Sequence, residues 1–272
     1  MCNRKSIKKY RESLSRNEAR ILSDLSYKGK GLFTLEDIRG YIESPKDLLH
    51  NLIRKNWILR IKNGVYLIAP LEAGELGAHS YTIHSFVIAS NLVNPYYISH
   101  WSALNYYGFT EQIPPAVYIT STKPRNRRRI LDTEFIFVTV PERKMFGITE
   151  IEIDKNMLKI STPEKTIVDC LDHPEHCGGI GEVAKGIYFE RNNLDLKTVV
   201  SMAERMRNRT IIKRLGYILD VFRLTEYIEI LKKIGLSEGY SKLDPKLPDK
   251  GKINEKWAIR INADINPEQW TK

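Results

Sequence analysis

Residues 57–68 contain two short runs of strand-forming residues, separated by Lys62-Asn63-Gly64. An Asn-Gly pair between two such runs is the strongest local signal of a β-hairpin, because both residues tolerate the left-handed backbone of a tight turn. We therefore expect strands at 57–61 and 65–68 joined by this turn. The hairpin ends a segment that also contains three helix-start signals.

Each helix-start signal is a Ser or Thr followed, three positions later, by an acidic residue. The hydroxyl of the first residue can cap the helix, and the carboxylate suits the positive end of the helix dipole. A proline at 45 also fits the first position of the third helix. The three pairs are Ser15 with Glu18, Thr34 with Asp37, and Ser44 with Asp47. They predict helices at about 15–27, 34–41 and 44–55.

The third helix has an apolar face, formed by Leu48, Leu49, Leu52 and Ile53, and an opposite polar face. Three helices followed by a tight hairpin predict a winged helix-turn-helix, in which the third helix is the recognition helix and the hairpin tip is the wing. Side chains there can donate to base edges and phosphates. The candidate DNA-binding residues are Lys46, His50, Asn51, Arg54 and Lys55 on the helix, and Arg60 and Lys62 on the wing.

The positive charge of the chain is concentrated in the same segment. Residues 1–70 carry 15 Lys/Arg against 7 Asp/Glu, a net charge of +8, whereas the whole chain carries +10. The other 202 residues therefore contribute only +2. Concentrated basicity on a small unit favours a polyanionic partner, most often nucleic acid. The alternative is a solvated basic face on a winged helix that binds protein.

The remainder of the chain predicts a mixed α/β region followed by a helical C-terminal part, so the expected fold class is α+β. We expect a winged helix-turn-helix domain at 1–70, a linker at 71–77, and an α+β effector domain at 78–272. Strands are expected at 116–121, 134–140, 149–153, 157–160 and 257–261. Helices are expected at 78–92, 99–108, 161–171, 179–191, 195–206, 209–221 and 225–234.

The densest basic cluster lies between the first two of these strands. It consists of Lys123, Arg125, Arg127, Arg128 and Arg129. Such a run is compatible with a second nucleic-acid contact, with docking to an acidic surface of a partner protein, or with a solvated loop. The sequence leaves these three interpretations open.

Two groups of residues raise the possibility of metal chemistry. Cys170, His173, His176 and Cys177 lie within eight residues of one another. A zinc site needs four tetrahedral ligands, and the proline at 174 and the adjacency of His176 and Cys177 oppose that geometry. We therefore expect Cys170 to be a core residue and the two histidines to lie in the loop after its helix, with no metal bound.

The second group comprises four carboxylates near strands, Asp132, Glu134, Glu152 and Asp154. A metal-dependent nuclease needs such carboxylates to converge on one edge with a nearby lysine. Lys155 points away from Glu152 and Asp154 if that strand is regular, which favours a solvent-facing side of an antiparallel sheet. A nucleic-acid enzyme is therefore the alternative function. We expect no catalytic residue and no cofactor.

Three segments together resemble one protein family. They are Ser99–Gly108 (SHWSALNYYG), Val117–Thr120 (VYIT) and Ser161–Leu171 (STPEKTIVDCL), the last extended by Cys177–Ile180 (CGGI). In this order they resemble the AbiEi-type antitoxins of type IV toxin–antitoxin, or abortive infection, systems. The resemblance covers about residues 15–235, and 161–180 is its most specific part.

The resemblance implies an N-terminal winged helix that represses its own operon and a C-terminal part that counteracts a nucleotidyltransferase-like toxin. It places Lys46, Asn51, Arg54, Arg60 and Lys62 at recognition-helix and wing positions, and it assigns no residue to the antitoxin activity. The expected partners are double-stranded operator DNA, bound as a dimer on an inverted repeat, and the cognate toxin. Three cysteines and the lack of a long apolar run predict a cytoplasmic protein that does not contact membranes.

Overall fold

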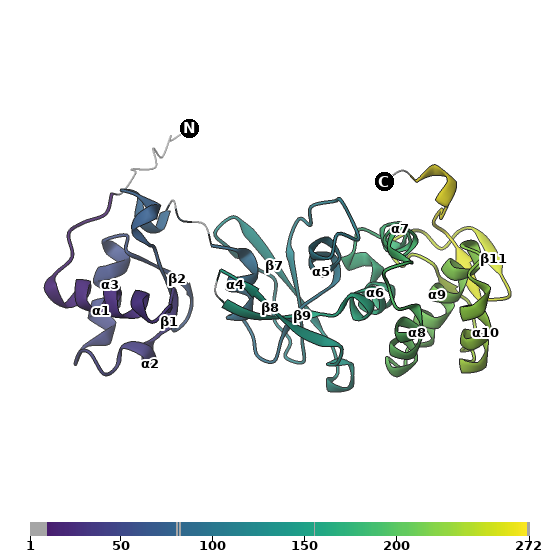
Figure 1. Cartoon of the computed structure of the whole chain (residues 1–272), viewed down its shortest axis with the longest axis horizontal. Helices are drawn as coiled ribbons and strands as arrows, with labels where there is room; N and C mark the ends of the chain where they lie inside the picture. Colours follow the sequence, from purple (N-terminus) through teal and green to yellow (C-terminus); the bar gives the residue numbers. More distant parts are fainter. Residues whose placement is uncertain (1–9, 80, 82, 155, 271–272) are drawn as a thin grey trace. The chain divides into compact units, whose positions relative to one another are not determined.

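The structure is a computed structural model, which describes residues 10–79, 81, 83–154 and 156–270 (Figure 1). The basic residues at 4–9, Cys2 and Lys155 lie outside this range. The chain divides into two compact units, one ending at Leu92 and one beginning at Val93. The boundary between the two units therefore lies C-terminal to the linker that was expected at 71–77. Residues 71–79 belong to the first unit because Arg11 N donates to Glu75 O (2.7 Å) and Ala78 N donates to Asn56 O (3.0 Å).

The first unit contains the predicted order of three helices and a hairpin, with one additional strand. From Arg16 to Ile68 its elements are α1 (Arg16–Tyr27), β1 (Leu32–Thr34), α2 (Leu35–Ile38), α3 (Pro45–Arg54), β2 (Ile58–Lys62) and β3 (Val65–Ile68). Strand β3 pairs in antiparallel fashion with both β1 and β2, which gives the order β1-β3-β2 among the described strands. The sequence did not predict β1, which is only three residues long.

The core of the first unit explains why the amphipathic helices form. Ile21, Leu22 and Leu25 of α1 and Leu48, Leu49 and Leu52 of α3 are buried in one cluster with Phe33 and Ile58 of the sheet. Burial of each such side chain contributes about 1.5–3 kcal/mol. The polar faces of α1 and α3 are left toward solvent.

The capping predictions hold for two of the three helices. Ser15 and Glu18 form a reciprocal capping box at α1, and Thr34 and Asp37 do so at α2. The predicted cap of α3 was wrong in detail, because the Ser44 hydroxyl donates to the Asp47 carboxylate instead of accepting from the helix backbone. Helix α2 also ends at Ile38, earlier than expected.

The single helix expected at 78–92 was wrong. This part of the first unit contains the short 3-10 helices η1 (Leu71–Ala73) and η2 (Gly77–His79), and then α4 (Ser85–Ser90). Helix α4 begins where the His84 side chain accepts a hydrogen bond from Phe86 N (3.2 Å).

The second unit is built on a sheet whose described strands follow the order β6-β7-β5-β4-β9-β8. Strands β5 and β7 are parallel, as are β4 and β9, and the remaining neighbours are antiparallel. The expected strands at 116–121, 134–140, 149–153 and 157–160 are confirmed, whereas β4 and β6 were missed. The strands are β4 (Tyr97–Ile98), β5 (Val117–Ser121), β6 (Arg128–Ile130), β7 (Thr133–Thr139), β8 (Ile148–Ile153) and β9 (Asn156–Ser161).

The helices of the second unit agree closely with the predicted ranges. They are α5 (His100–Tyr106), α6 (Pro163–Asp172), α7 (Ile180–Glu190), α8 (Leu196–Arg205), α9 (Arg209–Val221) and α10 (Thr225–Ile234), with short 3-10 turns η3 (Glu142–Lys144), η4 (Pro174–His176) and η5 (Pro267–Gln269). The chain is therefore mixed α and β, in agreement with the expected α+β class. None of the helices in the described ranges has the length and apolar character needed to cross a membrane.

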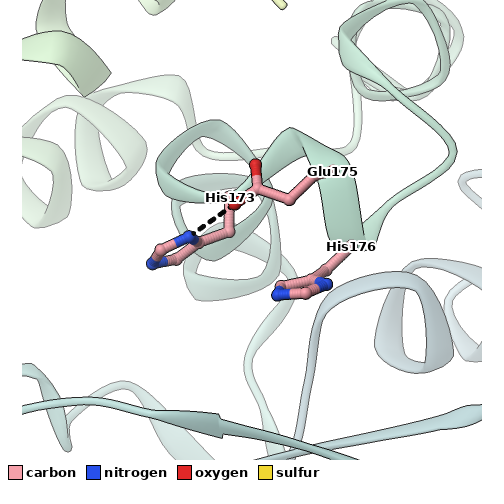
Figure 2. A group of neighbouring side chains, drawn as sticks. All are labelled: His173, Glu175 and His176. Atoms are coloured by element: carbon pink, nitrogen blue, oxygen red, sulfur yellow. Dashed lines mark hydrogen bonds and ion pairs between the residues drawn. The ribbon is translucent and has the colours of Figure 1, made fainter. Parts of the chain in front are cut away.

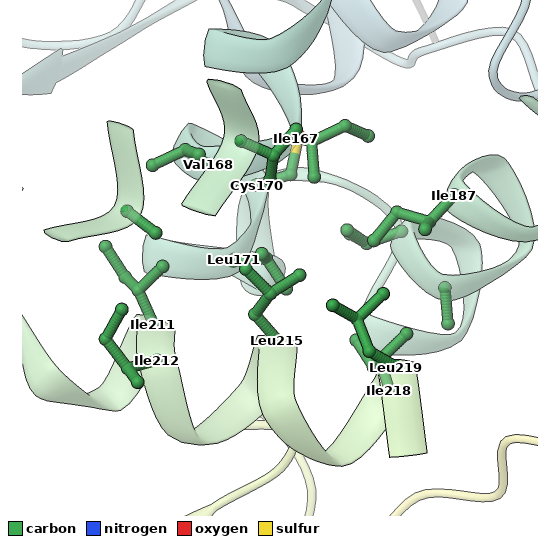
Figure 3. Packing of buried hydrophobic residues seen from close by; sticks show 14 of the residues in the cluster. Ile167, Val168, Cys170, Leu171, Ile187, Ile211, Ile212, Leu215, Ile218 and Leu219 are labelled. Carbon is green, nitrogen blue, oxygen red and sulfur yellow. The ribbon is translucent and has the colours of Figure 1, made fainter. Parts of the chain in front are cut away.

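Helix α6 lies at the centre of the helical core. Figure 3 shows Ile167, Val168 and Leu171 of this helix facing Ile211 and Leu215 of α9. A small C-terminal sheet formed by β10 (Ser241–Lys242), β12 (Ile259–Ile261) and β11 (Lys252–Asn254) follows, and Trp257 beside it is completely buried in the same core. This core fixes the ends of α5 and α6 that carry the polar groups described below.

Candidate nucleic-acid interface

A hollow of about 370 Å³ separates α3 from the tip of the β2–β3 hairpin. Lys46 and His50 of α3 line one side, and Arg60 and Asn63 line the other. Lys46, His50 and Ile53 are spaced by four and three residues, which places them on one face of the helix. Three of the seven predicted DNA-binding residues are thus brought together around one concave surface.

The polar side chains at this hollow are available to a ligand. Lys46 and His50 are exposed and form no hydrogen bond or ion pair with the residues that the structure describes. The Arg60 guanidinium donates to the Asn63 side chain, which holds both groups at the hairpin tip. Asn63 was predicted only as a turn residue, and its place beside Arg60 follows from the two-residue loop.

The expected position of Ile53 in the core was wrong. This side chain is 38% exposed and lines the hollow together with Tyr66 and Leu35. The reason is that Ile53 lies at the border of the apolar stripe, on the side that faces the hairpin. The hollow therefore has an apolar floor and a cationic rim.

Two of the predicted DNA-binding residues are held by acidic side chains of the same unit. Arg54 Nη1 donates to Glu12 Oε2 (2.7 Å), and Lys55 Nζ donates to Glu18 Oε2 (2.7 Å). Arg54 remains half exposed, whereas the Lys55 side chain is only 15% exposed. Lys55 is therefore mostly buried in an ion pair within the unit, and its assignment as a DNA contact stays a prediction. No local pattern in the sequence indicated either pair, because Glu12 and Glu18 lie 42 and 37 positions from their partners.

Asn51 and Lys62 lie at the margins of the surface. Asn51 is exposed on α3 but does not line the hollow. Lys62 is half-buried at the end of β2, where the pairing register shifts between Arg60 and Lys62. At this irregularity the side chains of β2 no longer alternate strictly between the two faces of the sheet.

Several other cations of the first unit already have partners within it. Lys28 pairs with Asp24 (2.7 Å), Lys30 with Asp37, and Arg39 with Glu36 (2.8 Å). The Arg11 guanidinium donates to two backbone carbonyls, those of Ala69 and Pro70 (2.6 Å each). Some cations of this basic segment are thus paired with carboxylates, whereas Lys46 and Arg60 at the hollow form no ion pair with the residues that the structure describes.

The basic cluster of the second unit lies on an exposed edge. All five of its cations are exposed, and Arg128 and Arg129 belong to the edge strand β6. Arg127 Nε lies 4.0 Å from Glu134 Oε1, at the limit of an ion pair, and both side chains are exposed. The cluster is therefore accessible to a partner.

The four carboxylates considered for nuclease chemistry do not converge. Asp132 and Glu134 lie at the β6–β7 edge of the sheet, whereas Glu152 lies on β8, at the opposite edge, with Asp154 in the turn that follows it. Glu152 is exposed on an antiparallel edge strand, as expected. One metal ion cannot be shared between these edges.

The predicted placement of Cys170 is confirmed, and Cys177 joins it in the core. Both cysteines are completely buried, and burial raises the pKa of the Cys177 thiol well above its ordinary value. Protonated, buried thiols are poor metal ligands. His173 directly precedes η4 and His176 is its last residue, so both lie after α6, as the sequence predicted, and beside Glu175 (Figure 2).

The pKa values of the histidines around η4 differ in direction. Burial lowers the pKa of His100 well below its ordinary value, with further lowering by His176 and His173. Burial also lowers the pKa of His176. The hydrogen bond to Glu175 raises the pKa of His173.

A buried charged network in the second unit was not predicted. Lys165 is completely buried, and its ammonium group contacts the Asp169 carboxylate and the Tyr97 hydroxyl (3.1 Å). Tyr97 in turn donates to Asp169 (3.0 Å), and burial raises its pKa well above the ordinary value. The only signal in the sequence was a lysine and an aspartate spaced by four residues on a helix.

No family model and no curated protein matches the sequence. Among solved structures, the crystal structure of RV2827C protein from Mycobacterium tuberculosis is similar, with a TM-score of 0.66 and 13% sequence identity. The similarity covers 91% of this chain and 92% of that chain. The two proteins therefore share a fold over nearly their whole lengths.

Proposed function

We propose that this protein is a DNA-binding regulator whose first unit is a winged helix, with α3 as the recognition helix and the β2–β3 hairpin as the wing. The observation that carries the proposal is the cationic hollow between α3 and the hairpin tip. Lys46, His50 and Arg60 approach it from both elements. A rim of unneutralised donors on a helix and a hairpin suits phosphates and base edges of a duplex.

The proposed interface is small, which has a consequence for stoichiometry. A single winged helix contacts too little DNA for tight operator binding. We propose that two copies bind an inverted repeat upstream of the protein's own operon, as repressors of this type do. The exposed donor Asn51 and the half-exposed Arg54 extend the α3 surface beyond the hollow.

The second part of the proposal concerns the α+β unit. On the resemblance of 99–108, 117–120 and 161–180 to AbiEi-type antitoxins, we propose that this unit counteracts a nucleotidyltransferase-like toxin. The separation of the chain into two compact units supports a division of labour between DNA binding and toxin control. The nuclease alternative is weaker, because the carboxylates that it needs lie at opposite edges of one sheet.

The experiment is a binding titration of the full chain with its own upstream DNA and with a scrambled duplex, at two salt concentrations. We expect a preference for the upstream DNA that weakens as salt increases, because phosphate contacts release counterions. Lys46→Ala and Arg60→Ala should each weaken binding about 10-fold, within the range expected for one direct contact of about 1–3 kcal/mol.

The matched control is Arg39→Ala, which removes an exposed cation of the same unit that pairs with Glu36 and does not line the hollow. This variant should change the affinity for the upstream DNA by no more than about twofold. Arg39 lies outside the hollow, and the loss of an exposed ion pair costs the fold little. Equal losses for Arg39→Ala and Arg60→Ala would indicate a general charge effect. No preference for the upstream DNA would instead assign the first unit to protein binding.

A further inference from the structure

Three histidines from separate parts of the second unit meet at the junction of α5, α6 and η4. His100 is the first residue of α5, His173 follows the last residue of α6, and His176 is the last residue of η4. Their ring centroids lie 5.7 Å (His100 to His176), 5.9 Å (His173 to His176) and 6.1 Å (His100 to His173) apart. The three imidazoles thus form a nearly equilateral triangle.

A carboxylate completes the set. Glu175 Oε1 lies 3.0 Å from His173 Nδ1, and ligand atoms of His173, Glu175 and His176 all lie within 4.8 Å of one another. Figure 2 shows the two imidazole rings projecting to the same side of η4. The proline at 174, which opposed a metal site in the sequence, begins the turn that brings these side chains together.

Two buried polar atoms at this junction have no hydrogen-bond partner among the described residues. They are His100 Nε2 and Glu175 Oε2. His100 is only 1% exposed, so water does not readily satisfy its ring nitrogen. A buried polar atom without a partner is unfavourable, because it has lost its hydrogen bonds to water and gained none in return. A cation placed between the rings would accept a lone pair from each of these atoms.

We propose that His100, His173, His176 and Glu175 bind one Zn²⁺ ion in a four-coordinate structural site. For tetrahedral zinc with Zn–N distances of about 2.0–2.1 Å, imidazole centroids lie about 5.2 Å apart. The observed separations exceed this value by less than 1 Å. His100 is not part of the group whose ligand atoms lie within 4.8 Å of one another, so its ring would have to move toward the other three ligands when the ion binds. Nitrogen and carboxylate ligands suit zinc, and the set differs from the cysteine-containing one considered from the sequence.

A neighbouring hydroxyl orients the buried ligand. His100 Nδ1 lies 2.8 Å from Ser99 Oγ, and Ser99 Oγ accepts a hydrogen bond from Thr120 Oγ1 (2.8 Å). When Nδ1–H donates to Ser99, the lone pair of Nε2 is left for the metal. Such outer partners fix the ring and its tautomer. The ion would join the start of α5 to the end of α6, two helices that also contact each other directly.

The test uses the full chain without an affinity tag, freed of metal by a chelator and then dialysed against Zn²⁺. We expect one Zn²⁺ per chain by metal analysis. His176→Gln and Glu175→Gln should each lower the affinity at least about 100-fold, and Ser99→Ala about 10- to 100-fold. His50→Ala, which removes an exposed histidine of the first unit, should leave the stoichiometry unchanged.

Co²⁺ provides a second readout of the ligand set. The proposal predicts the intense visible absorption of tetrahedral Co²⁺ without a thiolate charge-transfer band. His176→Gln and Glu175→Gln change partly buried side chains, and circular dichroism checks that both variants fold. Zinc binding that survives in both folded variants, a thiolate band, or no binding by the wild-type chain would overturn the proposal. None of these measurements involves DNA, so their outcome is independent of the proposed function.

Discussion

Lys55 Nζ lies 2.7 Å from Glu18 Oε2, the same oxygen that accepts the Ser15 amide in the capping box of α1. One carboxylate therefore closes the start of α1 and also fixes the residue that follows α3. The two side chains are 15% and 5% exposed, so the pair is largely shielded from solvent. It links the end of α3 to the first helix of the core.

Lys55→Met should reduce the stability of the first unit by about 2 kcal/mol, because a hydrogen bond to a charged group is lost and Glu18 is left buried. Hydrogen exchange of the α1 and α3 amides measures this change. Operator affinity should fall less than it does for Lys46→Ala. If a fully folded Lys55→Met variant loses more operator affinity than Lys46→Ala does, Lys55 contacts the DNA directly.

The contribution of this pair should also depend on pH. Burial acts to raise the pKa of Glu18, but hydrogen bonds from Lys55 and Ser15 outweigh it, so the pKa lies below its ordinary value of 4.5. A lowered carboxyl pKa contributes stability above the unfolded value, and that stability is lost as pH falls through the folded value. The difference between wild type and Lys55→Met should therefore be full at neutral pH and shrink below about pH 4. A constant difference would contradict the assignment.

Lys165→Met should destabilise the second unit by about 3–5 kcal/mol. The change leaves the buried Asp169 carboxylate without its cation, and removing one partner of a buried pair is costly. Lys165→Met combined with Asp169→Leu should recover most of the loss, because the uncompensated charge is removed as well. Urea unfolding followed by circular dichroism measures both variants. A single variant as stable as wild type would show that the pair is not essential to the fold.

Gly216→Ala should destabilise the second unit by about 1–3 kcal/mol through overpacking. A Cβ at this position of α9 would lie 2.2 Å from two ring atoms of the buried Trp257. Gly181→Ala in α7 is the matched control, because its Cβ would meet no atom within 4 Å. That change should be neutral or stabilise by about 0.4–1 kcal/mol. Thermal unfolding of the two variants separates crowding from a general effect of glycine replacement.

Replacing Lys123, Arg125 and Arg127 together by Ala should reduce the salt dependence of DNA binding. Each phosphate contact contributes about 0.9 to the slope of log K against log salt, so three contacts predict a decrease of about 2.7. The control removes three exposed lysines elsewhere in the second unit, Lys232, Lys233 and Lys252. An unchanged slope would exclude the cluster from the DNA interface and leave docking of a partner protein or a solvated loop.

Local signals predicted the elements well. The Ser15–Glu18 box, the Asn63-Gly64 turn and the periodic run at 209–221 each depend on residues within about one helical turn or one hairpin. Strands β1 and β6 were missed because each is three residues long, too short for a period-two pattern.

The sequence by itself determined where the hairpin and most helices lie, with the region 78–92 as the exception, because capping and turn chemistry act between neighbours in the chain. Only the tertiary structure decided which side chains are free and which are held. Glu18 reaches Lys55 across 37 positions, and Tyr97 reaches Lys165 across 68. His100 likewise meets His173 and His176 only because α5 and α6 pack together. Such contacts depend on how whole elements pack, and no local pattern in the sequence specifies that packing.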